Sequence, residues 1–332
     1  MGNDASSQWP DLPFKAWSGT CNTLLLWLQV VGKVRIACTA LINHWWNATF
    51  EVTSHGPLAP AMPYRGRTFD VLFDFTDHRL VIATSDGRTE TLALGPMAVA
   101  DFYAAFMRAL RGLGIDVHIW TVPSEIENAI PFEKDRTDAQ YDPVYVQKFW
   151  QAVLQAYRVM TEFRARFIGK VSPVHFFWGG LDLAVSRFSG RTAPPLTSVT
   201  PNVAAWVMNE AYSHEVSSCG FWPGNGGYGR AAFYVYAYPE PAGYGDTKLK
   251  TAEAAYDQKL GQFILPYDAV RQARDPDSLL LGFLQETYEA EAKLANWDRD
   301  ALERKSWPTR RDPEKAWPPR MTAAIRHPVG RS

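Results

Sequence analysis

The sequence contains few cysteines and has almost no net charge. Cys21, Cys38 and Cys219 are too few and too scattered for a disulfide framework, and none belongs to a CxxC pair. The 34 Lys and Arg residues nearly balance the 35 Asp and Glu residues, so no global field attracts nucleic acid or an anionic membrane. The cysteine usage predicts a reducing cytoplasm, and the charge balance argues against nucleic acid as a partner.

Long apolar segments are also lacking. The longest near-continuous apolar stretch, Leu24–Val31, contains Gln29 and is too short to span a bilayer. Residues 1–13 hold no basic segment followed by an apolar one, so the sequence predicts no secretory signal. We therefore expect a cytoplasmic protein without a membrane partner, and the sequence leaves its oligomeric state open.

No catalytic signature with a known mechanism is present. The glycine-rich run 221–230 lacks the GxxxxGK[ST] spacing of a phosphate-binding loop, and Ser213 and Ser217 lack a GxSxG elbow. There is no HExxH and no closely spaced histidine pair. The sequence by itself therefore assigns no reaction, no cofactor and no metal.

Aromatic residues are abundant, at 14% of the chain including 13 Trp. This content indicates heavily aromatic packing, either in the core or as walls around a pocket. The length of 332 residues allows a substantial core in one large domain or in two of ordinary size.

Periodicity predicts secondary structure in the first half of the chain. Residues 20–38 are nearly continuously apolar, which favours a buried helix, although Gly32 interrupts the pattern. Apolar and polar residues alternate within 69–94, where Asp86-Gly87 is a strong hairpin signal. We expect this segment to form an antiparallel meander.

The second half begins with Asp142, a helix N-cap followed by proline. Strands are expected over 212–219 and 231–238. The pattern over 251–297 is helical, with Asp277 as a capping residue. This half therefore also combines strands with helices.

The stretch Lys170–Arg191 is the most informative part of the chain. It reads as a strand in which Gly179-Gly180 marks either a bulge or the close approach of a backbone or ligand. Alternatively, the stretch is a bulged core strand without a binding role, in which His175 is hydrogen-bonded to a backbone carbonyl. The side chains with binding or catalytic capacity in this stretch are His175, Trp178, Asp182, Arg187 and Arg191.

Similar side chains occur in two other segments and add His44, Trp45, Trp46, His214, Glu215 and Trp222 to the candidate site. In a regular strand, His214 and Glu215 point to opposite faces. The guanidinium groups of Arg187 and Arg191 suit a carboxylate or phosphate ligand, or else pair with structural acids. The aromatic residues suit a planar ligand or the core.

These observations predict an α+β fold of antiparallel sheet units packed with helices. These units belong to one compact body, and its two halves are either similar to each other or unrelated. We expect an N-terminal half over residues 1–122, an irregular connector over 123–141, a C-terminal half over 142–302, and a basic, disordered tail over 303–332.

Several long strings resemble the motifs of DUF5996, an uncharacterised bacterial family described only as a domain of unknown function. The similarity spans about Trp9–Leu302 and leaves the basic tail outside. It implies no activity, cofactor or catalytic residue. The strings are TLLLWLQVVGKVRIA, NHWW, FDFTDHRLVIATSDG, SPVHFFWGGLDLAVSRFSGR, YSHEVSSCGFWPG and AFYVYAYPEP.

Three functional hypotheses remain open. The first is a small-molecule-binding protein or enzyme whose pocket is lined by the residues named above, because ligand pockets commonly combine aromatic walls with a few polar groups. The second is a metal-dependent hydrolase or oxygenase that uses His44, His175 and His214. The third is a non-catalytic interaction protein whose basic C-terminal tail recruits an acidic partner.

Overall fold

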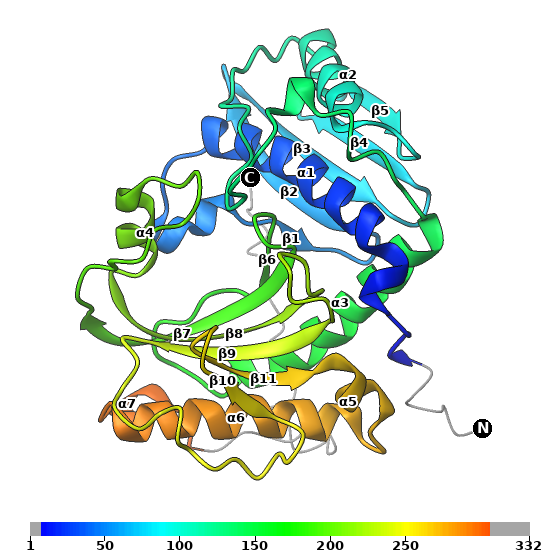
Figure 1. The fold of residues 1–332 in the computed structure, drawn as a ribbon. Helices are drawn as coiled ribbons and strands as arrows, with labels where there is room; N and C mark the ends of the chain where they lie inside the picture. Colours follow the sequence, from blue (N-terminus) through cyan, green and yellow to red (C-terminus); the bar gives the residue numbers. More distant parts are fainter. Residues whose placement is uncertain (1–7, 306–332) are drawn as a thin grey trace, which may run out of the picture.

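A computed structural model describes residues 8–305, and it has the predicted α+β architecture (Figure 1). Two antiparallel sheets are covered by helices. The first sheet has the order β1-β2-β3-β4-β5, so its strands are adjacent in sequence order. These strands are β1 (Glu51–Val52), β2 (Pro57–Tyr64), β3 (Arg67–Asp74), β4 (Arg79–Thr84) and β5 (Thr89–Ala93).

The meander predicted from alternation is confirmed by β3, β4 and β5, and the turn between the last two contains Gly87 at φ 85°. Strand β2 was not predicted, because its prolines hide the strand pattern. Proline cannot donate to a β-ladder. The pairing of β2 with β3 shifts register between Ala59 and Met62, and the carbonyl of the intervening Pro60 accepts a hydrogen bond from Arg35.

Helix α1 (Phe14–Cys38) contacts β2 of the first sheet and also contacts α3. It begins six residues before the predicted start at Thr20. Gly32 lies in its interior because a Cβ there would overlap the indole of Trp178. By length and composition α1 could cross a membrane, but 72% of its most apolar window is buried inside the protein, as in a core helix. Helix α2 (Val99–Gly112) also packs against α1 and β5.

The second sheet has the order β10-β11-β9-β8-β7-β6. Helices α3 (Pro143–Ala165) and α6 (Pro276–Leu294) pack against its central strands, and α5 (Tyr267–Gln272) packs against β9 and β11. The strands are β6 (His175–Phe177), β7 (Asp182–Thr192), β8 (His214–Trp222), β9 (Ala232–Tyr238), β10 (Ala255–Asp257) and β11 (Gln262–Pro266). Short helices complete the fold, namely η2 (Asn43–Ala48), η3 (Phe132–Lys134), α4 (Ala205–Ala211) and α7 (Arg299–Leu302).

The structure corrects three sequence predictions in this half. The stretch Lys170–Arg191 contains a hairpin and not one bulged strand, because β6 and β7 pair antiparallel on either side of a turn that contains Gly179-Gly180. The predicted helical segment 251–297 contains β10 and β11 before α5 begins. The N-cap of α6 is Asp275 and not Asp277, whereas Asp142 caps α3 as predicted.

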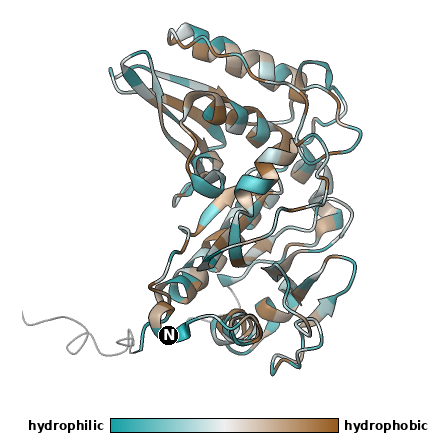
Figure 2. Cartoon of the chain, turned by 90° about the vertical axis from the view of Figure 1, so that its left-hand side faces the viewer, coloured by the Kyte–Doolittle hydropathy of each residue, from teal (hydrophilic) through white to brown (hydrophobic). Residues whose placement is uncertain are grey.

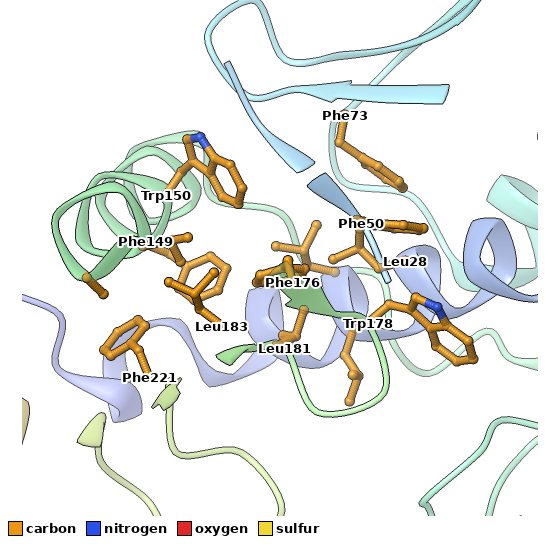
Figure 3. Close-up of a cluster of buried hydrophobic side chains, with 14 of the residues drawn as sticks. Leu28, Phe50, Phe73, Phe149, Trp150, Phe176, Trp178, Leu181, Leu183 and Phe221 are labelled. Atoms are coloured by element: carbon orange, nitrogen blue, oxygen red, sulfur yellow. The ribbon is translucent and has the colours of Figure 1, made fainter. Parts of the chain in front are cut away.

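The two sheets meet through a backbone bridge and a shared core. Phe50, which precedes β1, exchanges two backbone hydrogen bonds of 2.8 and 2.9 Å with Phe176 of β6. The rings of Phe50, Phe176 and Trp178 lie in the cluster drawn in Figure 3, and one hydrophobic cluster contains residues of both sheets. Helices with both hydrophobic and hydrophilic residues enclose this core (Figure 2).

The connector expected over residues 123–141, which lies between α2 and α3, contains only η3 as regular structure. The predicted disordered tail lies outside the described residues except for Glu303–Lys305, of which Glu303 forms a bridge with Phe167.

Alternation gives the second sheet two chemically distinct faces. The core face carries Leu183, Val185 and Arg187 of β7 and packs against α3 and α6. The opposite face, called the cavity face below, carries Asp182 and Ser186 of β7, Ser218 and Trp222 of β8, and Tyr234 and Tyr236 of β9. This second face looks toward α1 (Figure 1).

Candidate functional site

A cavity of about 760 Å³ lies between α1 and the cavity face of the second sheet. The connector 123–141 and the hairpin loop after β8 also contribute to its walls. The lining residues are Phe14, Ser18, Asn22, Leu25, Leu26, Glu125, Ile126, Asp138, Gly179, Gly180, Asp182, Tyr212, Trp222, Asn225, Gly226, Gly227, Tyr234, Tyr236 and Gln262.

Helix α1 forms one wall of the cavity. Its lining residues recur at spacings of three and four, so they share one helix face, where Ser18 and Asn22 are the polar members. On the facing sheet, Asp182, Tyr234 and Tyr236 provide a polar floor. The cavity therefore combines apolar walls with a small set of polar groups, which is typical of ligand sites.

Helix α1 also positions Glu125 through the residue before it. The amide group of Gln29 accepts from the backbone N–H of Ser124 at 2.8 Å and donates to its carbonyl at 3.0 Å. Lys33 donates to Ser124 Oγ at 3.1 Å. The N–H of Glu125 donates to Pro201 O at 2.8 Å, and Glu125 adopts φ 65°, a left-handed conformation that is unfavourable for a residue with a side chain.

Two consecutive glycines give the carboxylates of Glu125 and Asp182 access to the turn between β6 and β7. A Cβ on Gly179 would overlap the Glu125 carboxylate, and a Cβ on Gly180 would lie 3.0 Å from Asp182 Oδ1. Leu181, directly before Asp182, has φ 59°. The glycine pair therefore allows the close approach of carboxylate side chains at a turn, whereas the sequence suggested a bulge or the approach of a backbone or ligand.

Tyr234 fixes the orientation of Asp182. Its hydroxyl donates to Asp182 Oδ2 at 2.5 Å and occupies the space that a Cβ on Gly220 would need. Burial raises the pKa of Asp182 to about 6, although the hydrogen bond from Tyr234 opposes this shift. Burial raises the pKa of Tyr234 well above its usual value, so this hydroxyl remains a donor at neutral pH.

Glu125 has a still higher pKa, about 7, because the surrounding protein removes bulk water and because the charge of Asp182 is close by. The side chain is nevertheless exposed, since it faces the open cavity. A carboxylate enclosed by protein walls but still in contact with cavity water can exchange protons with a ligand near neutral pH.

Hydroxyl groups continue the polar floor beyond Asp182. Tyr212 and Tyr236 hydroxyls lie 2.9 Å apart, Tyr236 is hydrogen-bonded to Ser218, and Ser218 Oγ lies 2.9 Å from Ser186 Oγ. This chain can orient donors and acceptors toward a ligand, because each hydroxyl both donates and accepts.

The glycine-rich hairpin loop between β8 and β9 closes one side of the cavity. Trp222 donates to Asn225 Oδ1 at 2.7 Å and stacks on Tyr228 at a centroid distance of 4.9 Å. Gly226 and Gly227 have φ of 68° and 94°, conformations that favour glycine. The loop thus places an amide and an aromatic face at the cavity wall.

Of the residues singled out from the sequence, Asp182 and Trp222 line this cavity. Four others, His44, Trp46, His175 and His214, gather in a separate aromatic cluster. The rings of His44 and His214 are 5.6 Å apart, and those of Trp46 and His175 are 6.4 Å apart. His44 bonds to Ala211 O through Nδ1 at 3.0 Å and accepts from Lys170 through Nε2 at 2.6 Å.

Both buried histidines of this cluster are held neutral. Burial lowers the pKa of His44, and burial together with Arg164 lowers the pKa of His175 to about 3. Within residues 8–305, no group of three or more His, Cys, Asp and Glu side chains is placed to hold a metal ion. The structure therefore offers no support for a three-histidine metal centre.

The remaining predicted residues lie outside the cavity. The indole N–H groups of Trp45 and Trp178 donate to Val207 O at 3.0 Å and Ala48 O at 2.6 Å. Arg191 pairs with Glu215 at 2.7 Å. Arg187 is on the core face, where its guanidinium lies 3.4 Å from the ring centroid of Phe163.

Sequence reasoning missed Glu125, Tyr234 and Tyr236. Glu125 lies in the irregular connector, where no periodicity indicates which side chains face inward. The strand prediction for 231–238 did contain a usable signal, since Tyr234 and Tyr236 alternate with buried Val235 and therefore share one face.

The fold and the cavity define an α+β protein with a carboxylate-containing cavity between α1 and its second sheet. The chain belongs to DUF5996, a family of unknown function whose model matches residues 9–304. No curated protein and no solved structure matches it. The family assignment confirms the resemblance found in the sequence and leaves function to be argued from the cavity.

Proposed function

We propose that this protein binds a small organic cation, such as a protonated or quaternary amine attached to a flat apolar group, in the cavity between α1 and the second sheet. The observation that carries the proposal is the charge of the lining. Among the described residues, it includes the carboxylates of Glu125, Asp182 and Asp138 but no Lys, Arg or His.

The size and walls of the cavity support this ligand class. A volume of about 760 Å³ lies in the range of roughly 300–1,000 Å³ typical of small-molecule sites. Trp222, Tyr234 and Phe14 offer aromatic surfaces, and aromatic faces attract cations as well as flat apolar groups. A bound cation would also lower the raised pKa values of these carboxyl groups, because it favours the ionised form of each nearby carboxylate.

The proposal is tested by calorimetric titration of the full-length protein with benzyltrimethylammonium, whose charge does not depend on pH. Benzyl alcohol and phenylacetate serve as neutral and anionic comparisons. We expect the cation to bind at least about tenfold more tightly than either, equivalent to about 1.4 kcal/mol. Its affinity should rise with pH from 5 to 7.5 as Asp182 and Glu125, with pKa values of about 6 and 7, ionise.

Isosteric variants locate the site. Asp182→Asn and Glu125→Gln should each weaken cation binding about tenfold and flatten its pH dependence. Asp101→Asn is the matched control, because Asp101 of α2 pairs with Arg136 and does not line the cavity. Equal affinity for all three probes, or unchanged affinity in both cavity variants, would show that the cavity is not a cation site.

A further inference from the structure

The two cavity carboxylates differ in a way that a binding site alone does not require. Asp182 receives a hydrogen bond of 2.5 Å from Tyr234, which stabilises its ionised form. Glu125 contacts the backbone at Gly179 and faces the open cavity. When environments separate two titratable groups in this way, they can take the roles of base and acid.

The Asp182 side chain and the backbone that carries Glu125 are also held more firmly than charge attraction would need. Tyr234, Gly180 and the turn residue Leu181 restrict Asp182, and the anchor from Gln29 to Ser124 restricts the segment that carries Glu125. Residues 125 and 181 have left-handed backbone conformations, which concentrate at functional sites because the surrounding structure must enforce them. Fixed placement of reacting groups is a major source of catalytic rate.

We infer that Asp182 and Glu125 are a catalytic base and acid that move a proton on the bound molecule, so that the cavity catalyses an isomerisation by proton transfer. This inference rests on the proposed binding function and assigns chemistry to the same site. The substrate class is a small amine-bearing molecule with an acidic C–H bond beside a carbonyl or a similar electron-withdrawing group.

The reaction balances without a cofactor or a second substrate. Asp182 Oδ1 takes the proton from carbon, the electron pair of that C–H bond forms a double bond to the carbonyl carbon, and the carbonyl π pair moves onto oxygen to give an enolate. The carboxylic acid of Glu125 donates a proton at another atom of the intermediate, which completes the isomerisation. Asp182 ends protonated and Glu125 ionised, and proton exchange with cavity water restores both.

A probe that needs only a base tests the central step. In 5-nitrobenzisoxazole, removal of the C3 proton breaks the N–O bond and releases 2-cyano-4-nitrophenolate, which absorbs visible light. At equal concentration, the full-length protein should exceed acetate by at least about 100-fold, the lower end of general-base contributions. The rate should rise with pH around 6, as Asp182 ionises, and benzyltrimethylammonium should inhibit it by competition.

Variants separate catalysis from folding and binding. Asp182→Asn should lower the rate about 100-fold or more, and Asp101→Asn should leave it unchanged. Tyr234→Phe should move the pH midpoint upward, because it removes a hydrogen bond that stabilises ionised Asp182; a purely structural role for Tyr234 would not shift this midpoint.

The outcomes distinguish this inference from the binding proposal. A protein that binds benzyltrimethylammonium but accelerates the probe no more than acetate does is a cation-binding protein without the inferred activity. Activity that survives in Asp182→Asn with its pH midpoint unchanged would likewise overturn the inference. If Asp182→Asn abolishes the activity but the natural protein shows no selective cation binding, the inferred proton transfer stands and the proposed ligand class is rejected. If Asp182→Asn fails to fold, the pH midpoint of Tyr234→Phe decides between the two.

Discussion

Strand β7 carries two ionisable side chains on opposite faces of the second sheet, and they have opposite surroundings. Arg187, on the core face, is 1% exposed. Its guanidinium lies 3.4 Å from the ring centroid of Phe163 and 4.3 Å from that of Tyr288, and it also donates to the carbonyl of Phe163. Asp182, on the cavity face, has Tyr234 as one partner and open space in front of it.

This comparison shows that a displaced pKa does not by itself mark a functional group. Burial lowers the pKa of Arg187 to about 10 and raises that of Asp182 to about 6. Arg187 is enclosed by rings that attract its charge, so this charge is stabilised within the protein. Asp182 keeps one side open to a ligand. The cavity, more than the size of the pKa shift, therefore separates a functional site from a structural one.

The largest expected effect is the loss of stability when Arg187 is truncated. Arg187→Ala removes the ring contacts and one hydrogen bond and leaves a space in the core, so the free energy of unfolding should fall by about 3 kcal/mol or more. Denaturant unfolding measures this change. Arg191→Ala is the control, because the partly exposed pair of Arg191 with Glu215 should contribute less than about 1 kcal/mol. Equal losses in the two variants would remove the contrast between the faces.

Local patterns in the sequence predicted much of the fold. The meander β3 to β5 follows from alternation and one hairpin signal, and the start of α3 follows from Asp142 as N-cap. Strand β2 and the β6–β7 hairpin were missed, because prolines obscure the first and Gly179-Gly180 fits a bulge as well as a turn.

The candidate site was predicted only in part, because its assembly depends on contacts between distant segments. Asp182 and Trp222 are recognisable as polar and aromatic residues on strands. Glu125 reaches the same cavity through Gln29, which is 95 residues away from Ser124 in sequence. His44 and His175 carry equally suggestive side chains, yet they lie in the separate aromatic cluster with Trp46, because no local pattern specifies which strand face meets α1.

Two glycine substitutions separate an effect on core packing from an effect on the candidate site. Gly32→Ala places a methyl group against the buried ring of Trp178 and should cost about 1–3 kcal/mol of unfolding free energy. Gly179→Ala meets the exposed end of the Glu125 side chain, so stability should change by less than about 1 kcal/mol while the affinity for benzyltrimethylammonium falls. Thermal unfolding and calorimetric titration of both variants provide the measurements. The distinction fails if Gly32→Ala loses affinity without losing stability.

The last expected effect is a pH dependence of stability that comes from the two cavity carboxyl groups. The pKa values of Asp182 and Glu125, about 6 and 7 in the folded protein, lie above the ordinary values of 3.8 and 4.5 that apply when the chain is unfolded. As pH rises from about 4 to 7, the folded state therefore holds more protons than the unfolded state, and the free energy of unfolding decreases.

The double variant Asp182→Asn and Glu125→Gln lacks this titration. Its stability relative to the natural sequence should therefore increase between pH 4.5 and 7.5 and level off above about pH 8, when both carboxyl groups are ionised in either state. Denaturant unfolding of both proteins at matched pH values isolates the effect, because every other titrating group is common to them. A difference in stability that stays constant with pH would mean that the two carboxyl groups titrate at ordinary values. The cavity would then differ from the protein surface in shape but not in its electrostatic environment.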